Sequence, residues 1–183
     1  MMVSVARRST GRSPFACALG VLVLVLLAAL ALAAPSLAAQ ESGIAVGAMA
    51  PAAAVETLDG LPADLKDLIG TRPLVIEFWA TWCTSCRELE PTIMAAHARY
   101  KDRVTFVGVA VSVNQSSERV RRYVAEHMLG FTHFYDRRGH AVEAYDVPAT
   151  SYVVVVDAKG KVVYTGIGGR QVLDAAIARA LQE

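Results

Sequence analysis

The chain has 183 residues, of which 54% are hydrophobic, and a formal net charge of +1. That length supports one domain with a buried core. The near-neutral charge, with no basic stripe interleaved with aromatic residues, excludes a protein that holds nucleic acid by electrostatic attraction.

Residues 1–38 are typical of a secretory signal peptide. Arg7, Arg8 and Arg12 precede an apolar run over residues 15–34, and the small residues Ser36 and Ala38 then offer a cleavage site. The run is also long enough to cross a bilayer, so an uncleaved membrane anchor is the alternative. We expect cleavage, because the run turns alanine-rich before the small residues. The sequence therefore predicts a periplasmic or other extracytoplasmic protein that contacts the membrane only if this segment stays attached.

The remainder is predicted to form a linker at 39–46 and one domain at 47–183. A near-continuous apolar run at 74–79 predicts a strand buried on both faces, and Asp59-Gly60 predicts a turn. In chain order, the elements are a strand at 53–58, a helical turn at 63–69, a strand at 74–79, a helix at 84–100, a strand at 104–113, a helix at 116–128, a strand at 132–135, a short helix at 139–145, a hairpin of strands 152–156 and 162–165, and a helix at 170–181. This order is that of an α/β sandwich with one mixed sheet.

Cys83 and Cys86 lie where the strand at 74–79 gives way to a helix. A pair at this spacing can close a disulfide across one helical turn. The unpaired N–H groups of the first turn favour the thiolate of Cys83, the form that attacks disulfides. We therefore expect Cys83 to be the exposed, attacking thiol and Cys86 the buried, resolving one. Thr84 and Ser85 between them carry hydroxyls that can hydrogen-bond a thiolate.

Two other interpretations of the cysteine pair remain. A structural disulfide is one, although so short a loop constrains the unfolded chain little. Half of a metal site is the other, although a tetrahedral site needs more ligands than one pair supplies. Covalent haem attachment is excluded, because Arg87 and not histidine follows Cys86.

Glu77 is the one charged residue in the buried strand. A buried carboxylate without a partner is costly and normally has a raised pKa. In the alternative, Glu77 points to an edge and meets Arg72 or Lys101.

These residues resemble the thioredoxin superfamily, specifically its exported TlpA/ResA-like branch. The resemblance runs from about residue 47 to 181. It is carried by Gly47-x-x-Ala50-Pro51, Asp59-Gly60, Phe78-Trp79-Ala80-Thr81-Trp82-Cys83-x-x-Cys86, Pro91, Tyr145-x-Val147 and Asp157-x-x-Gly160-Lys161-Val162-Val163. A cysteine pair at this spacing is a strong signal only within such an order of elements.

The resemblance implies a thioredoxin-like three-layer sandwich, with a mixed central sheet, an N-terminal β-hairpin extension and flanking helices. It implies a thiol-disulfide oxidoreductase that needs no bound cofactor and reduces protein disulfides, in cytochrome c maturation or copper-site assembly. A membrane-bound electron donor would then re-reduce it. Glu77 would accept the proton of Cys86, and Trp82 would cover the disulfide and contact a substrate peptide.

The loop that holds a cis-proline in the family departs from the pattern. An ungapped alignment places Ser151 at the proline position, preceded by Thr150, and a gapped one assigns Pro148. All three are candidates for contact with substrate. A cis bond before Ser151 would cost several kcal/mol, roughly 2.5–4, so the bond is either trans in a reshaped loop or held under strain.

Two further functions stay open. One is a copper- or zinc-handling module that uses the reduced pair, and the other is a non-catalytic thioredoxin-like binding domain. The four histidines lack ligand spacing and are interpreted as surface or packing residues; they are His97, His127, His133 and His140.

Overall fold

The structure is a computed structural model that describes residues 43–183. The predicted signal segment at 1–38, and the linker as far as residue 42, lie outside the described residues. Within 43–183, no helix combines the length and apolar character needed to cross a membrane. The described residues form an α/β fold around one seven-stranded sheet with the order β2-β1-β5-β4-β3-β6-β7.

The elements follow the predicted order closely. They are β1 (Ala54–Thr57), β2 (Pro62–Asp64), the 3-10 helix η1 (Leu65–Leu68), β3 (Leu74–Trp79), α2 (Thr84–Tyr100), β4 (Thr105–Val111), α3 (Ser117–Glu126), β5 (Thr132–Asp136), α4 (His140–Ala144), β6 (Tyr152–Val156), β7 (Val162–Ile167) and α5 (Leu173–Ala180). The strand predicted at 104–113 ends earlier, at Val111. The helical turn predicted at 63–69 is shorter, because its first residues pair with β1 as β2.

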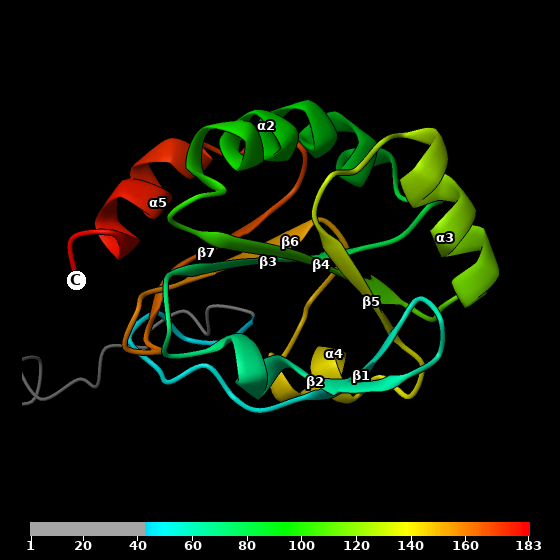
Figure 1. Cartoon of the computed structure of the whole chain (residues 1–183), viewed down its shortest axis with the longest axis horizontal. Coiled ribbons are helices and arrows are strands. Elements are labelled where there is room, and N and C mark those ends of the chain that lie inside the picture. The colour runs from blue at the N-terminus through cyan, green and yellow to red at the C-terminus, as the bar shows by residue number, and fades with distance from the viewer. Residues whose placement is uncertain (1–42) are drawn as a thin grey trace, which may run out of the picture. The chain divides into compact units, whose positions relative to one another are not determined.

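The sheet is mixed, as expected. β3 pairs in parallel with β4, and β4 with β5, whereas β6, β7, β1 and β2 join by antiparallel pairing. Helices α2, α3 and α5 cover one face, and η1 and α4 lie on the other (Figure 1). The predicted three-layer, thioredoxin-like sandwich with an N-terminal hairpin is confirmed.

Strand β3 lies inside the sheet and is buried along its whole length. Its alternate residues point to opposite faces. Leu74, Ile76 and Phe78 enter the core shared with η1 and α4. Val75 and Trp79 pack on the side of α2. Glu77, which lies between those two in the alternation, faces the same side as α2.

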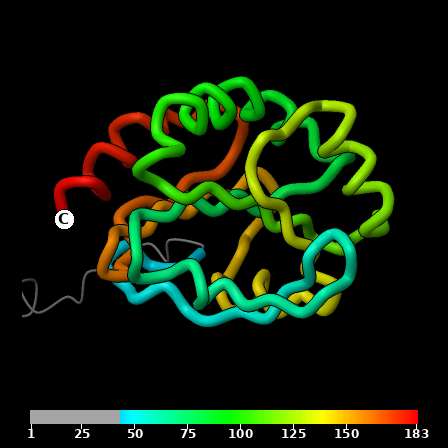
Figure 2. Tube along the Cα trace, in the orientation of Figure 1, coloured from blue at the N-terminus to red at the C-terminus, as the bar shows by residue number. Residues whose placement is uncertain are grey.

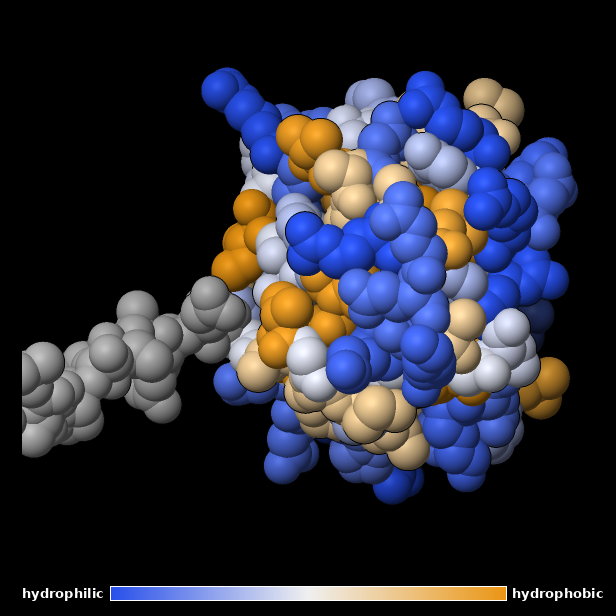
Figure 3. Space-filling view, turned by 90° about the vertical axis from the view of Figure 1, so that its left-hand side faces the viewer, coloured by the Kyte–Doolittle hydropathy of each residue, from blue (hydrophilic) through white to orange (hydrophobic). Residues whose placement is uncertain are grey.

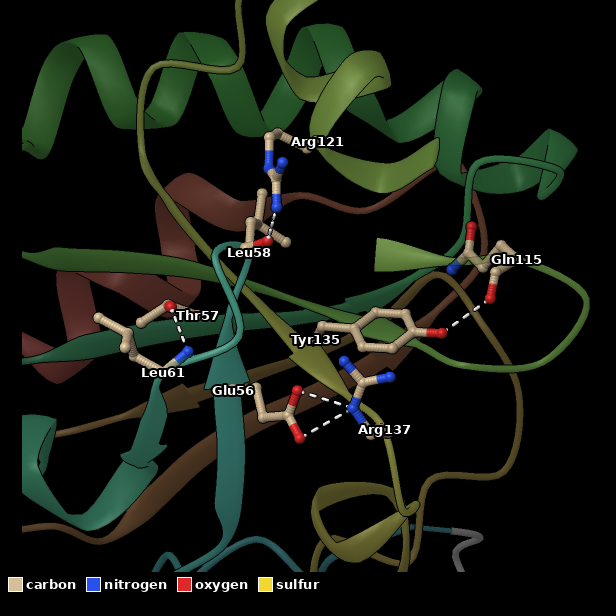
Figure 4. Close-up of polar contacts among 8 residues, drawn as sticks. All are labelled: Glu56, Thr57, Leu58, Leu61, Gln115, Arg121, Tyr135 and Arg137. Atoms are coloured by element: carbon tan, nitrogen blue, oxygen red, sulfur yellow. Dashed lines mark hydrogen bonds and ion pairs between the residues drawn. The ribbon is translucent and has the colours of Figure 1, made fainter. Parts of the chain in front are cut away.

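The β1–β2 hairpin is tied to the rest of the domain by side chains. The Nε atom of Arg137, just after β5, donates to both carboxylate oxygens of Glu56 at 2.9 and 2.8 Å. Arg121 of α3 donates to the carbonyl oxygen of Leu58 in the hairpin turn (Figure 4). These contacts fix the hairpin, which forms one edge of the sheet, to α3 and to the end of β5.

Helix α5 covers the end of the sheet near the C-terminus, where it contacts β6 and β7. Helix α5 lies beside α2 in the Cα trace (Figure 2), and Arg99 pairs with Asp174 at 2.5 Å between them. The surface at that end is largely hydrophilic, with apolar side chains in small separate groups (Figure 3). The cysteines lie at the opposite end of β3, where α2 begins.

Candidate active site

A disulfide joins Cys83 and Cys86 at the start of α2, with their Cα atoms 5.3 Å apart. Cys83 is the N-cap residue of the helix, and its Sγ atom accepts the N–H of Cys86 at 3.0 Å. The hydroxyl of Ser85 lies 3.5 Å from the same sulfur. A thiolate on Cys83 would therefore meet donors already aimed at it, and hydrogen bonds to the charged form lower a thiol pKa.

Cys83 is less exposed than the sequence predicted. Its exposed fraction is 4% and that of Cys86 is 5%. The prediction of an exposed attacking thiol is wrong for this oxidised state, because Cys83 packs in the apolar cluster that also contains Trp79 and Ala110. The adjacent Trp82 is 40% exposed.

Trp82 is held by the loop between β4 and α3. Its Nε1 atom donates to the carbonyl oxygen of Val113 at 2.7 Å, so the ring is tied to that loop. Val113 is 58% exposed, and the two side chains give this end of the molecule an apolar surface next to Cys83. Such a surface suits contact with a peptide.

The same loop supports the backbone before Cys83. The side-chain oxygen of Gln115 accepts the N–H of Thr81 at 2.9 Å, and its side-chain nitrogen donates to the carbonyl oxygen of Val111. Tyr135 of β5 donates its hydroxyl to the backbone oxygen of Gln115 at 2.7 Å (Figure 4). The sequence analysis missed Gln115, whose role depends on a contact across 34 positions of the chain.

Glu77 is buried, with an exposed fraction of 5%, and the alternative of an edge position paired with Arg72 or Lys101 is wrong. Burial, followed by the nearby charge of Glu90, raises the pKa of its carboxyl to about 8. Glu77 and Cys86 line the same small cavity, which offers about 10 Å³ to the centre of a water molecule. A carboxyl with a pKa near neutral beside a resolving thiol is equipped to take up its proton.

Glu90 and Tyr123 line the same cavity, and Glu90 also contacts His127 outside it. The carboxylate of Glu90 accepts the hydroxyl of Tyr123 at 3.0 Å, and its other oxygen lies 2.9 Å from Nδ1 of His127. Glu90 is four residues after Cys86, which places both on one face of α2. That spacing was a usable signal, but the partners on α3 could not be read from it.

His133 is buried on β5, across Gly108 of β4 from Glu77. Both of its ring nitrogens lack a hydrogen-bond partner, as does Nε1 of Trp79. Burial lowers the pKa of His133 to about 3, so the ring is neutral at ordinary pH. The prediction that it is a packing residue agrees with its stacking on Phe131 at 4.5 Å.

The loop before β6 has the trans, reshaped form that was one of the two alternatives for Ser151. In residues 43–183 every peptide bond is trans, so neither Ser151 nor Pro148 provides a cis bond. Ser151 is fully buried and has a φ of 62°, in the left-handed region. Its carbonyl oxygen accepts the N–H of Gly168 at 3.0 Å and the side chain of Gln171 at 3.1 Å. Thr150 is half-buried and Pro148 exposed.

The loop of Ser151 is connected to the cysteine turn through glycines. A Cβ on Gly169 would approach the carbonyl oxygen of Ser85 to 3.1 Å, so Gly169 lies against the residue between the cysteines. A chain of contacts thus runs from Ser151 through Gly168 and Gly169 to the cysteine turn. Within the part of the chain that the structure describes, no three His, Cys, Asp or Glu side chains come together as metal ligands.

Comparison with known proteins agrees with this geometry. Residues 45–180 match the Redoxin family. Thioredoxin-like protein YneN of Bacillus subtilis is 32% identical over 122 residues, which are 66% of this chain and 71% of YneN. Thiol-disulfide oxidoreductase ResA of the same organism is 28% identical over 125 residues, which are 68% of this chain and 69% of ResA.

Solved structures show the same likeness. A thiol:disulfide interchange protein from Chlorobium tepidum is 26% identical with a TM-score of 0.64, covering 75% of this chain and 98% of its own. A secreted disulfide oxidoreductase from Mycobacterium tuberculosis is 27% identical with a TM-score of 0.60, covering 71% and 95%. The chain therefore belongs to the Redoxin family, and it is a thiol-disulfide oxidoreductase of the thioredoxin-like, ResA-related kind.

Proposed function

We propose that the protein is exported and reduces disulfides of other proteins outside the cytoplasm, with Cys83 as attacking thiol, Cys86 as resolving thiol and Glu77 as proton acceptor. The observation that carries this proposal is the arrangement at the start of α2. There the sulfur of Cys83 accepts the N–H of Cys86 at 3.0 Å, while Cys86 and the buried Glu77 line one cavity.

The reaction would proceed in two exchanges. The Cys83 thiolate attacks a substrate disulfide, a bond forms between Cys83 and one substrate sulfur, and the other substrate sulfur leaves as a thiolate. Cys86 then gives its proton to the Glu77 carboxylate and attacks Cys83. The second substrate sulfur leaves with the electron pair of the broken bond. The substrate gains two electrons and two protons, and the dithiol becomes the disulfide that the structure contains.

Location and partners complete the proposal. The signal-like residues 1–38 support export, and the related M. tuberculosis protein is described as secreted. An extracytoplasmic reductant that is oxidised in each cycle needs a dithiol donor, for which a membrane-bound electron carrier is the natural source. We place the substrates among apocytochrome c or copper-site cysteines, in line with the TlpA/ResA-like resemblance.

Two variants test the roles of the cysteines. Cys83→Ser should abolish insulin reduction, because no thiolate remains at the helix terminus. Cys86→Ser should retain attack and accumulate mixed disulfides on Cys83, seen by non-reducing electrophoresis. Activity that survives in Cys83→Ser, with no adducts on Cys86→Ser, would assign the roles the other way round.

Trapping in cells tests the substrates. Cys86→Ala expressed with its own signal should carry covalent partners, identified by mass spectrometry after non-reducing purification. Apocytochromes or copper-site proteins among them would support the proposed role. Trapped proteins of cytoplasmic origin only would contradict both the location and the substrate class.

A further inference from the structure

The burial of Glu77 affects how its carboxyl can gain and release a proton. With a pKa of about 8, only about a tenth of the carboxyl is ionised at pH 7. A carboxyl that accepts a proton from Cys86 must also release it before the next cycle. No ion pair or hydrogen bond of the described residues connects Glu77 to the surface.

The cavity beside Glu77 offers a route outward. Its lining includes Glu77, Cys86, Glu90 and Tyr123, closed by apolar residues. The free space of about 10 Å³ is enough for the centre of one water molecule, and polar groups from β3, α2 and α3 surround it. One such water could accept from the protonated carboxyl of Glu77 and donate to the carboxylate of Glu90.

Glu90 reaches from this cavity to the surface. Its side chain is 25% exposed and that of its partner His127 is 35% exposed. Tyr123 donates to one oxygen of Glu90 and His127 contacts the other. The rings of Tyr123 and His127 stack with their centroids 3.8 Å apart, which fixes both partners on α3. Glu90 is therefore held with one end at the cavity and the other at solvent.

We propose that Glu90 is a proton-relay residue, which takes the proton of Glu77 through one water in the cavity and passes it to solvent beside His127. The proposal rests on the function proposed above. The proton leaves Cys86 as its sulfur attacks, resides on Glu77, moves through the water to Glu90, and is lost to bulk water. Tyr123 keeps its own proton and holds Glu90 in place, because burial and the nearby Glu90 raise its pKa to about 12.

The groups that face Glu77 come from every element packed around it. Cys86 and Glu90 belong to α2, Tyr123 to α3 and His133 to β5, across Gly108. Buried His133 stays neutral and has no polar partner, so it offers no outlet. Glu90 is the one carboxyl among them that also touches solvent.

Stopped-flow kinetics with the aromatic disulfide DTNB test the relay. Reduced protein releases one coloured thiolate when Cys83 attacks and a second when Cys86 resolves the adduct. The rate of the second release should rise with pH to a plateau. In Glu90→Gln its midpoint should move to lower pH, because the charge that opposes ionisation of Glu77 is gone. Its plateau should fall roughly tenfold, less than the ~10²-fold or more expected for a direct acid–base group.

Glu90→Gln keeps the structural contact of Glu90, because its amide oxygen still accepts the Tyr123 hydroxyl. A slower second release in this variant therefore reports on the proton relay and not on the loss of that contact. Glu88→Gln, an exposed glutamate two positions away on α2, is the matched control and should leave the plateau unchanged. An unchanged plateau in Glu90→Gln overturns the relay, while a slowed Glu77→Gln in the same assay leaves the proposed function intact. Absence of a second release in wild type would overturn the proposed function itself.

A second measurement follows the Glu77 carboxyl alone. In protein with ¹³C-labelled glutamate carboxyls, the NMR titration of Glu77 should have a lower midpoint in Glu90→Gln than in wild type, because the charge that opposes its ionisation is gone. A Glu77 midpoint that is the same in both proteins would show that Glu90 does not act on this carboxyl, and would overturn the relay.

Discussion

At the scale of single residues, the site depends on one missing side chain. Gly108 lies between Glu77 and His133 in the register of three neighbouring strands. A Cβ there would come within 2.3 Å of Nδ1 of His133 and 2.8 Å of Nε1 of Trp79. The absence of a Cβ lets two buried rings close over the centre of the sheet. The closed packing shields Glu77 from water, and this burial is the main reason that its pKa rises, followed by the charge of Glu90.

Ser151 yields a prediction because of its backbone conformation. A φ of 62° costs an L-residue roughly 1–2 kcal/mol, which glycine does not pay. Ser151→Gly should therefore be tolerated without loss of stability, and it also removes a buried hydroxyl that has no partner. Ser151→Pro should destabilise by more than about 1 kcal/mol, because proline fixes φ near −65°.

Thermal melts of both Ser151 variants beside wild type provide the measurement. A cis bond before Ser151 would give the opposite result, because a proline at position 151 would then fit the loop. A proline variant as stable as wild type would show that the loop adopts a different backbone in solution. Pro148→Ala, three positions upstream and exposed, is the control for loss of a loop residue.

At the scale of elements, the cysteine turn is built from β3, α2 and the loop after β4. The sulfur of Cys83 caps the N-terminus of α2. The loop after β4 holds Thr81 and Trp82, the two residues that precede Cys83. Two hydrogen bonds, to Thr81 and to Trp82, cross from one element to the other. The loop therefore fixes the backbone and the tryptophan ring that immediately precede Cys83.

Gln115 is the residue of that loop with the largest expected effect. Gln115→Ala leaves the largely buried N–H of Thr81 without its acceptor, which should lower the free energy of unfolding by about 1–3 kcal/mol. Urea unfolding of the oxidised protein measures it. Gln115→Glu keeps an acceptor for Thr81 but cannot donate to Val111, so its loss should be smaller. Equal stability of Gln115→Ala and wild type would mean that water replaces the side chain.

At the scale of the whole molecule, local patterns predicted most of the fold. The apolar run of β3 and the cysteine spacing are adjacent in sequence, so the strand, the helix start and the burial of Glu77 followed directly. The partnership of Glu90 with Tyr123 and His127 did not, because it requires α3 to be docked on α2 across more than 30 positions. The conformation of Ser151 was also beyond reach, because serine does not specify a positive φ.

The pH dependence of folding follows from Glu77. Its pKa is about 8 in the folded protein and 4.5 as its ordinary value, so between those values the folded state binds more protons than the unfolded state. The contribution of Glu77 to the free energy of unfolding is fully present below about pH 4.5. It falls as pH rises toward 8, by at most about 5 kcal/mol. Glu77→Gln has no such proton to lose. Its stability relative to wild type should therefore increase from pH 5 to pH 8.5, in urea unfolding of the oxidised proteins.

Glu126→Gln, which removes an exposed carboxyl of α3, is the control. A difference between Glu77→Gln and wild type that stays constant over this range would mean that water reaches the Glu77 carboxyl freely. In that case the carboxyl would not need an outlet through Glu90.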